Sequence, residues 1–157
     1  MSERILLPLD GSKLGEAGLS YVHDLISKLA PEEKVEIILF HVITATRHTL
    51  HFQGGWEAVS VPYNEEELTK MKDEAISYLQ EVSKGLQNTQ ATVQCKVSVN
   101  ENAADEIIKA EEEVNADLVA MSTHGRSGIS RFTVGSVAEK VLRGGSVPVL
   151  MVRARES

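Results

Sequence analysis

The chain has 157 residues, a formal net charge of −7 at neutral pH and a single cysteine, Cys95. This length predicts one domain over residues 1–157, which can bury roughly two thirds of its unfolded surface without disulfides. The acidic balance argues against a nucleic acid partner, because such binding draws on dense basic patches. No apolar run approaches the roughly 20 residues of a membrane span, and Ile5–Leu9 is too short for a signal-peptide core. We therefore expect a cytoplasmic protein with no membrane contact.

Apolar runs alternate along the chain with amphipathic stretches of helical period. Five strands are predicted in chain order: Arg4–Leu9, Val35–Ile43, Thr92–Val99, Leu118–Met121 and Val147–Val152. Helical stripes begin at Leu14, Leu68, Ala104 and Val134; Pro31 ends the first, and Asn102 can cap the third. This alternation is typical of parallel strands joined by helical crossovers. It predicts an α/β fold with helices on both faces of an open sheet.

A long connection from Thr44 to Pro62 joins the second strand to the second helix. It carries His48 and His51, with Trp56 nearby. Neither cysteines nor carboxylates stand beside these histidines at ligand spacing, so the pattern favours a surface loop over a zinc site. A lid over a bound ligand is the alternative that this segment leaves open.

The segment from Ser122 to Ser136 lies between the fourth strand and the fourth helix and is rich in small residues. A helix that begins near Gly135 would direct its unpaired N–H groups and its positive dipole end toward this segment. Glycine also lets the backbone approach a phosphate closely. These features predict an anion site of the kind that holds a phosphate.

Within this segment, Thr123-His124-Gly125 is followed after nine residues by Gly135-Ser136. This spacing closely resembles the nucleotide-binding signature of the universal stress protein family. The resemblance covers the whole chain and includes Ile5–Ser12, Leu39–Val42, Gly135–Leu142 and Val147–Val152. The family signature usually has a glycine where this chain has Ser122. Serine keeps the backbone N–H and adds a hydroxyl, but it needs more room, so the difference bears on affinity.

The resemblance implies an open, Rossmann-like sheet of five parallel strands in the order 3-2-1-4-5. It also implies that ATP, ADP or AMP binds between strands one and four, where the strand order reverses. The residues that it assigns to this site are Pro8, Asp10, Val42, Met121, Ser122, His124, Gly125, Arg126, Gly135, Ser136 and Val137.

Each assigned residue also has a structural interpretation. Asp10 can accept from ribose hydroxyls or lie near a phosphate-bound Mg²⁺, but Asp-Gly leading to Ser12 as a helix cap also explains it. Pro8 lines the crevice or simply ends the pairing of the first strand. The family's binding mode implies that the backbone of Val42 meets the adenine edge.

Val42, Met121 and Val137 otherwise resemble ordinary core residues. His124 donates to a phosphate or shapes the loop, and Arg126 approaches the ligand or stays in solvent. His41, on a strand predicted to be buried, is interpreted as a core histidine with a hydrogen-bond partner.

Pro148 lies in the fifth predicted strand, and a proline there lacks a donor for the ladder. This places the strand at a sheet edge. An edge as apolar as Val147–Val152 needs cover, and the family resemblance suggests a homodimer through it, as twofold assemblies are common. The alternative is that the charged tail from Arg153 to Ser157 protects the edge.

The sequence offers little support for catalysis. It contains none of the usual glycine-rich motifs of NTPases, α/β-hydrolases or dinucleotide oxidoreductases. Phosphoryl transfer also needs a positioned cation and a group that orients the nucleophile, and Asp10 alone does not supply them. We therefore expect an ATP-binding sensor or accessory protein of the stress response. The alternatives are a relative that works through protein contacts without nucleotide, and an enzyme limited to slow ATP hydrolysis.

Overall fold

The computed structural model describes residues 2–51, 54, 58–86, 90–123 and 135–154. Its elements, in chain order, are β1 (Ser2–Pro8), α1 (Ala17–Ile26), β2 (Lys34–Ile43), β3 (Arg47–His51), β4 (Ala58–Pro62), α2 (Glu65–Ser83), the 3₁₀ turn η1 (Lys84–Leu86), β5 (Ala91–Val99), α3 (Ala103–Glu113), β6 (Leu118–Ser122), α4 (Ser136–Gly144) and β7 (Val149–Val152). Among these described residues, no helix is both long and apolar enough to cross a membrane.

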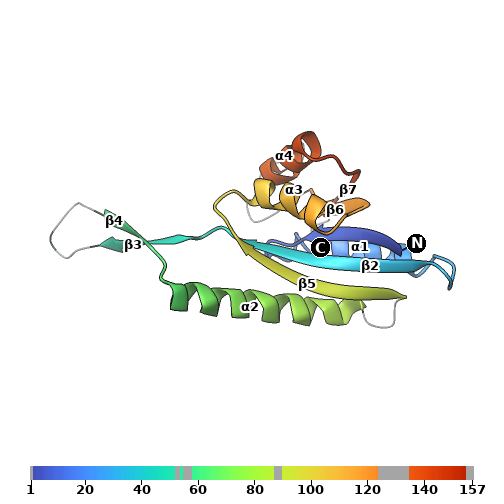
Figure 1. Cartoon of the computed structure of the whole chain (residues 1–157), viewed down its shortest axis with the longest axis horizontal. Coiled ribbons are helices and arrows are strands. Elements are labelled where there is room, and N and C mark those ends of the chain that lie inside the picture. The colour runs from blue at the N-terminus through green and yellow to red at the C-terminus, as the bar shows by residue number, and fades with distance from the viewer. Residues whose placement is uncertain (1, 52–53, 55–57, 87–89, 124–134, 155–157) are drawn as a thin grey trace.

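The main sheet has five strands in the order β5-β2-β1-β6-β7, and every pairing in it is parallel. Numbered along the chain, these five strands give the predicted order 3-2-1-4-5, so the predicted fold class is confirmed. β7 lies at one edge, as the proline argument required, although the strand begins at Val149, just after Pro148. Helices cover both faces of the sheet, with α2 on one side and α3 and α4 on the other (Figure 1).

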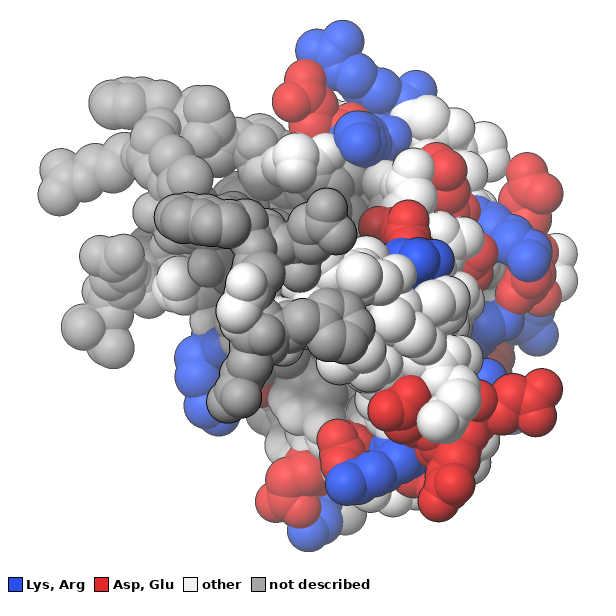
Figure 2. Space-filling view, turned by 90° about the vertical axis from the view of Figure 1, so that its left-hand side faces the viewer, with Lys and Arg blue, Asp and Glu red and all other residues white. Residues whose placement is uncertain are grey.

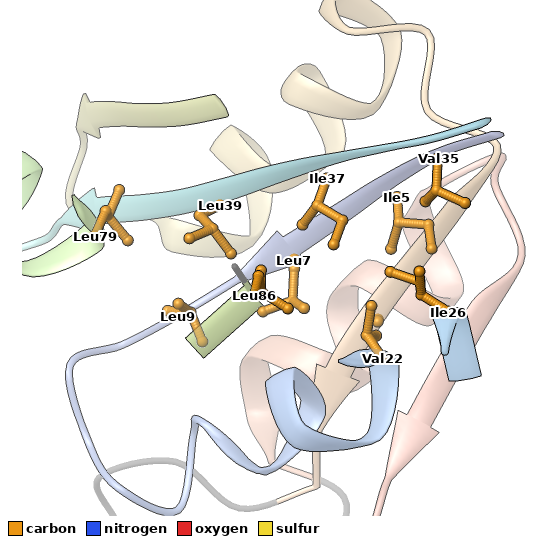
Figure 3. Close-up of a cluster of buried hydrophobic side chains, with 11 residues drawn as sticks. Ile5, Leu7, Leu9, Val22, Ile26, Val35, Ile37, Leu39, Leu79 and Leu86 are labelled. Atoms are coloured by element: carbon orange, nitrogen blue, oxygen red, sulfur yellow. The ribbon is translucent and has the colours of Figure 1, made fainter. Parts of the chain in front are cut away.

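The first face of the sheet packs against α1, α2 and η1. Alternate residues of the central strands, such as Ile5 and Leu7 of β1, point toward Val22 and Ile26 of α1 (Figure 3). The full buried set is Ile5, Leu7, Leu9, Val22, Ile26, Val35, Ile37, Leu39, Leu79, Leu86 and Ala120. Burying each large aliphatic side chain contributes roughly 1.5–3 kcal/mol, so this layer fixes α1 and α2 on the sheet.

The intervening residues of the same strands face α3 and α4. Leu6 of β1 and Phe40 of β2 pack there against Ile107 of α3 and Val141 of α4, all nearly inaccessible to solvent. Because successive side chains of a strand point to opposite faces, a strand buried on both faces is apolar throughout. This explains why the runs of the central strands are almost entirely apolar.

The connection after β2 differs from the expected surface loop. Residues Arg47–His51 and Ala58–Pro62 form an antiparallel two-stranded ribbon, in which Leu50 pairs with Val59. The ribbon projects from the sheet end at which β2 terminates (Figure 1). Both side chains of this pair stay largely exposed. No residue of these two described strands is buried, so the ribbon has no core-facing side that would mark it as a strand pair.

Two of the helices begin with asparagine caps, of which the sequence predicted one. Asn102 caps α3 by accepting from the Asp105 amide, as predicted. Asn64 caps α2 in a reciprocal box with Glu67. The predicted start of the first helix near Leu14 is wrong, because α1 begins at Ala17. The intervening residues form a hydrogen-bonded turn, which belongs to the site described next.

Candidate functional site

A cavity of about 570 Å³ opens at the carboxyl ends of the strands. It lies where β1 and β6 are neighbours, at the reversal of strand order that favours ligand binding in such sheets. Predicted site residues on its wall are Pro8, Asp10, Val42, Met121, Ser122, Gly135, Ser136 and Val137. The structure therefore brings together residues that lie up to about 130 positions apart in the chain. His124, Gly125 and Arg126, also predicted for the site, lie outside the described residues.

The face of the molecule at this end of the sheet carries both signs of charge. Among the described residues, Figure 2 shows lysines and arginines interspersed with aspartates and glutamates on this face.

The turn after β1 folds tightly around Asp10. One carboxylate oxygen, Oδ1, accepts from the Ser12 amide at 2.9 Å and from the Ser12 hydroxyl at 2.6 Å. Ser12 Oγ in turn accepts from the Gly15 amide at 2.9 Å. Ser12 is thus a turn residue rather than the helix cap that the alternative interpretation required, and Glu16 precedes the helix instead. A carboxylate held in this way is already oriented before a ligand arrives.

Gly15 allows the carboxylate of Asp10 to lie across the turn. A Cβ at position 15 would stand 2.3 Å from Asp10 Oδ1 and 3.0 Å from Ser12 Oγ, closer than atoms approach without moving. The turn can therefore adopt this arrangement only with glycine at that position.

Ser122 ends β6 and faces the same turn. Its hydroxyl donates to the Leu14 carbonyl oxygen at 2.8 Å. The serine that departs from the family signature thus has a role within this fold, because it fixes the turn after β1 to the end of β6. The sequence pointed to an added hydroxyl and a greater need for room but gave no partner for that hydroxyl.

The start of α4 borders the cavity. Gly135 precedes the helix with φ −55° and ψ 148°, and its own amide donates to the Thr123 carbonyl at 3.1 Å. Whereas Asn side chains cap α2 and α3, Gly135 has no side chain to accept from the first amides of α4. Ser136 and Val137 both line the cavity, so these helix-start residues border its space.

The glycine at 135 is not required by the backbone. Its φ and ψ are open to any L residue, and among the described residues a Cβ there would contact the Thr123 carbonyl oxygen at an ordinary 3.5 Å. Neither the backbone angles nor this contact therefore accounts for a glycine at this position.

The edge of β2 beside the cavity extends beyond its neighbour β1. Pairing between β1 and β2 ends at Pro8 and Phe40, whereas β2 continues beside β5 as far as Ile43. The backbone at Val42 therefore borders the cavity on the side from which β1 has withdrawn. This is the arrangement needed for backbone recognition of a flat heterocycle.

His41 occupies the floor of this region. Its Nδ1 lies 2.7 Å from the carbonyl oxygen of Leu9. Since a carbonyl only accepts, the ring donates from Nδ1. The predicted partner for a strand histidine is thus present, but the ring is half-buried and also lines the cavity.

Sequence reasoning missed the wall that α2 contributes. Met71, Glu74, Ala75 and Tyr78 line the cavity at spacings of three and four residues, so they share one face of the helix. Such a stripe indicates burial without saying whether a core or a ligand lies opposite. Ala103 and Ile107 of α3 line the cavity in the same way.

Tyr78 carries the largest shift in acidity at this site. Its hydroxyl donates to Glu16 Oε1 at 3.0 Å. Burial raises the pKa of Tyr78 far above its ordinary value of 10, and the hydrogen bond to Glu16 and its negative charge add to that rise. The hydroxyl therefore stays protonated and acts as a donor.

A metal site built from side chains has no support among residues 2–51, 54, 58–86, 90–123 and 135–154, which contain no group of three or more histidine, cysteine or acidic ligands. His48 of β3 instead stacks on Tyr63 at a ring distance of 4.9 Å.

The fold is that of an open-sheet α/β protein with a cavity at the carboxyl ends of its parallel strands. A family model described as the universal stress protein family matches residues 1–153. The chain belongs to this family.

Relatives and solved structures agree with that assignment. Universal stress protein MJ0577 of Methanocaldococcus jannaschii is 29% identical over all of this chain and 98% of its own length. MJ0531 of the same organism is 28% identical over 96% of this chain and 82% of its own length. A solved structure of MJ0577 superposes with a TM-score of 0.73 at 25% identity, covering 99% of this chain and 98% of that one. UspA of Lactobacillus plantarum shares the fold, with a TM-score of 0.70 at 16% identity and coverage of 96% and 97%.

Proposed function

We propose that this chain is a cytoplasmic universal stress protein that binds an adenine nucleotide, ATP or its products ADP and AMP, in the cavity at the carboxyl end of the sheet. The observation that carries the proposal is the convergence of Asp10, Val42, Ser122, Gly135 and Ser136 on one cavity. These residues come from three strand ends and one helix start, and no packing requirement of the core explains their common destination.

Each part of a nucleotide has a matching surface. The open edge of β2 at Val42 suits the adenine edge, and the oriented carboxylate of Asp10 suits the ribose hydroxyls. The start of α4 at Gly135 and Ser136 suits the phosphates. The volume of about 570 Å³ lies within the usual range for small-ligand sites. His124, Gly125 and Arg126 are proposed to complete the phosphate side.

Solved structures of other universal stress proteins hold related ligands. One is described in complex with cAMP and another, from Archaeoglobus fulgidus, in complex with dAMP. At 19% and 16% identity these proteins share the fold with this chain. The ligand class proposed for this chain therefore rests on its own cavity.

The proposed role is that of a sensor or accessory protein rather than an enzyme. The described cavity wall offers Asp10 and Glu74 as acidic groups but no lysine or arginine in position to stabilise a transferring phosphoryl group. Any Mg²⁺ would be held through the phosphates, with Asp10 nearby rather than as a direct ligand. We expect at most slow ATP hydrolysis, which Asp10→Ala would abolish in a phosphate-release assay.

A homodimer through β7 is the proposed assembly. The strand lies at the sheet edge and offers Val149, Leu150, Met151 and Val152, all only partly buried in the monomer. Pairing with the same strand of a second copy would complete the ladder and cover these side chains. Light scattering after size exclusion tests this directly. The expected mass is twice that of the chain, and a monomer at micromolar concentration would contradict it.

The binding proposal is tested by identifying what the purified protein retains. The protein is prepared without added nucleotide, denatured, and the released small molecules are identified by mass spectrometry, with Gly135→Val as the matched variant. Adenine nucleotide released from the parent and absent from the variant is the expected result. A parent protein that releases none and also fails to bind added Mg-ATP would instead favour a family member that acts through protein contacts alone.

A further inference from the structure

The turn from Asp10 to Glu16 is held by two other elements of the cavity wall. On one side Ser122 of β6 donates to the Leu14 carbonyl. On the other side Tyr78 of α2 donates to Glu16 Oε1 at 3.0 Å. These contacts join positions 108 and 62 residues apart in the chain. The turn is therefore clamped between β6 and α2.

Tyr78 meets this turn at both of its ends. Its hydroxyl reaches Glu16, the last residue before α1. Its ring stands edge-on to the ring of His41, with 6.2 Å between centroids, and His41 Nδ1 donates to Leu9, the residue before the turn. Tyr78 thus contacts a group at each end of the turn: His41, which is bonded to Leu9 after β1, and Glu16, which precedes α1.

The other contact of the Glu16 carboxylate, with Lys13, would not take over the role of the hydrogen bond from Tyr78. Glu16 Oε2 lies 3.4 Å from the Lys13 ammonium, but the Lys13 side chain is almost fully exposed and belongs to the same turn. An exposed pair of this kind contributes little. The half-buried hydroxyl of Tyr78 is the contact that ties Glu16 to a different element.

From this geometry we infer that Tyr78 is a positioning residue, which acts through Glu16 to hold the Asp10 turn against the cavity and so determines the affinity for a ribose that carries hydroxyl groups. The inference rests on the proposed function, because it assigns Asp10 to the ribose. A turn that loses one of its two clamps samples more conformations, and binding must then restore the orientation of the carboxylate. Affinity is therefore expected to fall only for ligands that bind to Asp10.

The test compares two nucleotides in one variant. Tyr78→Phe keeps the ring and removes only the hydroxyl, and affinities for ATP and for 2′,3′-dideoxy-ATP are measured by calorimetry. ATP affinity is expected to fall roughly three- to tenfold, in line with the net contribution of one typical hydrogen bond. The affinity for the dideoxy nucleotide is expected to stay unchanged. Tyr21→Phe is the control, since Tyr21 is a largely exposed tyrosine of α1.

A second comparison shows whether the hydroxyl acts through Glu16. Glu16→Ala alone should reproduce the loss of ATP affinity, and adding Tyr78→Phe to it should cause no further loss. Additive losses would overturn the inference, as would equal losses for ATP and the dideoxy nucleotide or no loss at all.

Failure of the inference and failure of the proposed function give different results. If the unmodified protein binds no adenine nucleotide, the proposed function is wrong and the role of Tyr78 falls with it. If the unmodified protein binds ATP but Tyr78→Phe binds it equally well, only the positioning role is wrong.

Discussion

The two ends of the main sheet both carry carboxylates and glycines, but they use them differently. At the amino end, polar groups from different elements form hydrogen bonds with one another and hold those elements together. At the carboxyl end, the Asp10 turn combines hydrogen bonds between neighbours in sequence with contacts to β6 and α2, and a cavity remains beside it. Acidic residues near strand ends therefore indicate a binding site only where a cavity lies beside them.

At the amino end Arg4 joins three elements. Its Nε donates to Glu36 of β2 at 3.0 Å, its guanidinium also reaches the Val114 carbonyl, and its backbone amide donates to Asp117. Glu111 of α3 is 1% exposed and accepts from the Ser146 amide ahead of β7. These contacts hold strands and helices together and border no described cavity.

The glycines at the two ends offer the sharpest contrast. A Cβ at Gly145 would stand 2.6 Å from both carboxylate oxygens of Glu111 and 2.9 Å from the Val141 carbonyl oxygen. The Glu111 carboxylate is buried and the Val141 oxygen belongs to the backbone, so neither can move aside easily. Gly145→Ala should therefore lower the free energy of unfolding by about 2–3 kcal/mol. Urea denaturation measures the change.

The control for that substitution is Gly85→Ala, since a Cβ at Gly85 has no atom within 4 Å. Its free energy of unfolding should change by no more than about 0.5 kcal/mol. Equal effects of the two substitutions would mean that the contact with Glu111 does not constrain the fold.

Gly15→Ala addresses the carboxyl end. The new methyl group would displace the carboxylate of Asp10 from Ser12, but this turn is only partly buried and its side chains can move. Nucleotide affinity should fall about tenfold or more, while the free energy of unfolding falls by only about 1 kcal/mol. Calorimetry and urea denaturation on the same samples separate the two effects. A variant that loses stability but keeps its affinity would contradict the assignment of Asp10 to the ligand.

Glu111→Gln tests the amino end through pH. Burial raises the pKa of Glu111 above its ordinary value of 4.5, and the hydrogen bond from the Ser146 amide opposes that rise. A carboxyl with a raised pKa binds its proton more tightly in the folded state. It therefore stabilises the fold below pH 4.5, and this contribution is lost as the pH rises through the folded-state pKa.

The parent protein should accordingly lose stability relative to Glu111→Gln, by about 1 kcal/mol, as the pH rises from acidic to neutral. Urea denaturation at a series of pH values measures the difference. Parallel stability profiles for the two proteins would show that the Glu111 carboxyl titrates normally in the fold.

Ser122→Ala should have the smallest effect. It removes the donor to the Leu14 carbonyl and should cost about 0.5–1 kcal/mol in the free energy of unfolding. Ser122→Gly, which restores the usual family residue, should lose the same hydrogen bond. If either variant proves more stable than the parent by thermal unfolding, the bond from Ser122 does not hold the turn.

The family resemblance implied the strand order, and the sequence itself predicted most element positions, because β1 and β2 are largely buried on both faces and their runs are mostly apolar. It missed the β3–β4 ribbon because exposed Leu50 and Val59 give no half-buried pattern. It placed the start of α1 too early because a serine after Asp-Gly resembles a cap. Only the structure shows that Ser12 is already used within the turn.

The predicted site residues that the structure describes do border one cavity, as the family resemblance implied. The α2 wall was not predicted, because the period that places Met71, Ala75 and Tyr78 on one face is the period of any buried helix. The bond between Ser122 and Leu14 was also beyond prediction. A contact between residues 108 positions apart depends on how the strands are ordered, not on local sequence.

Nucleotide binding in the cavity is tested most directly by a nitrogen-15 correlation spectrum recorded during titration with ATP. If the cavity binds ATP, the amide signals of Val42, Ser136 and Val137 shift in proportion to the fraction of protein with ATP bound. The signals of Asp117 and Gly145, at the opposite end of the sheet, stay in place. Shifts confined to the amino end, or none at millimolar ATP, would contradict the claim that the cavity at the carboxyl end is a nucleotide site.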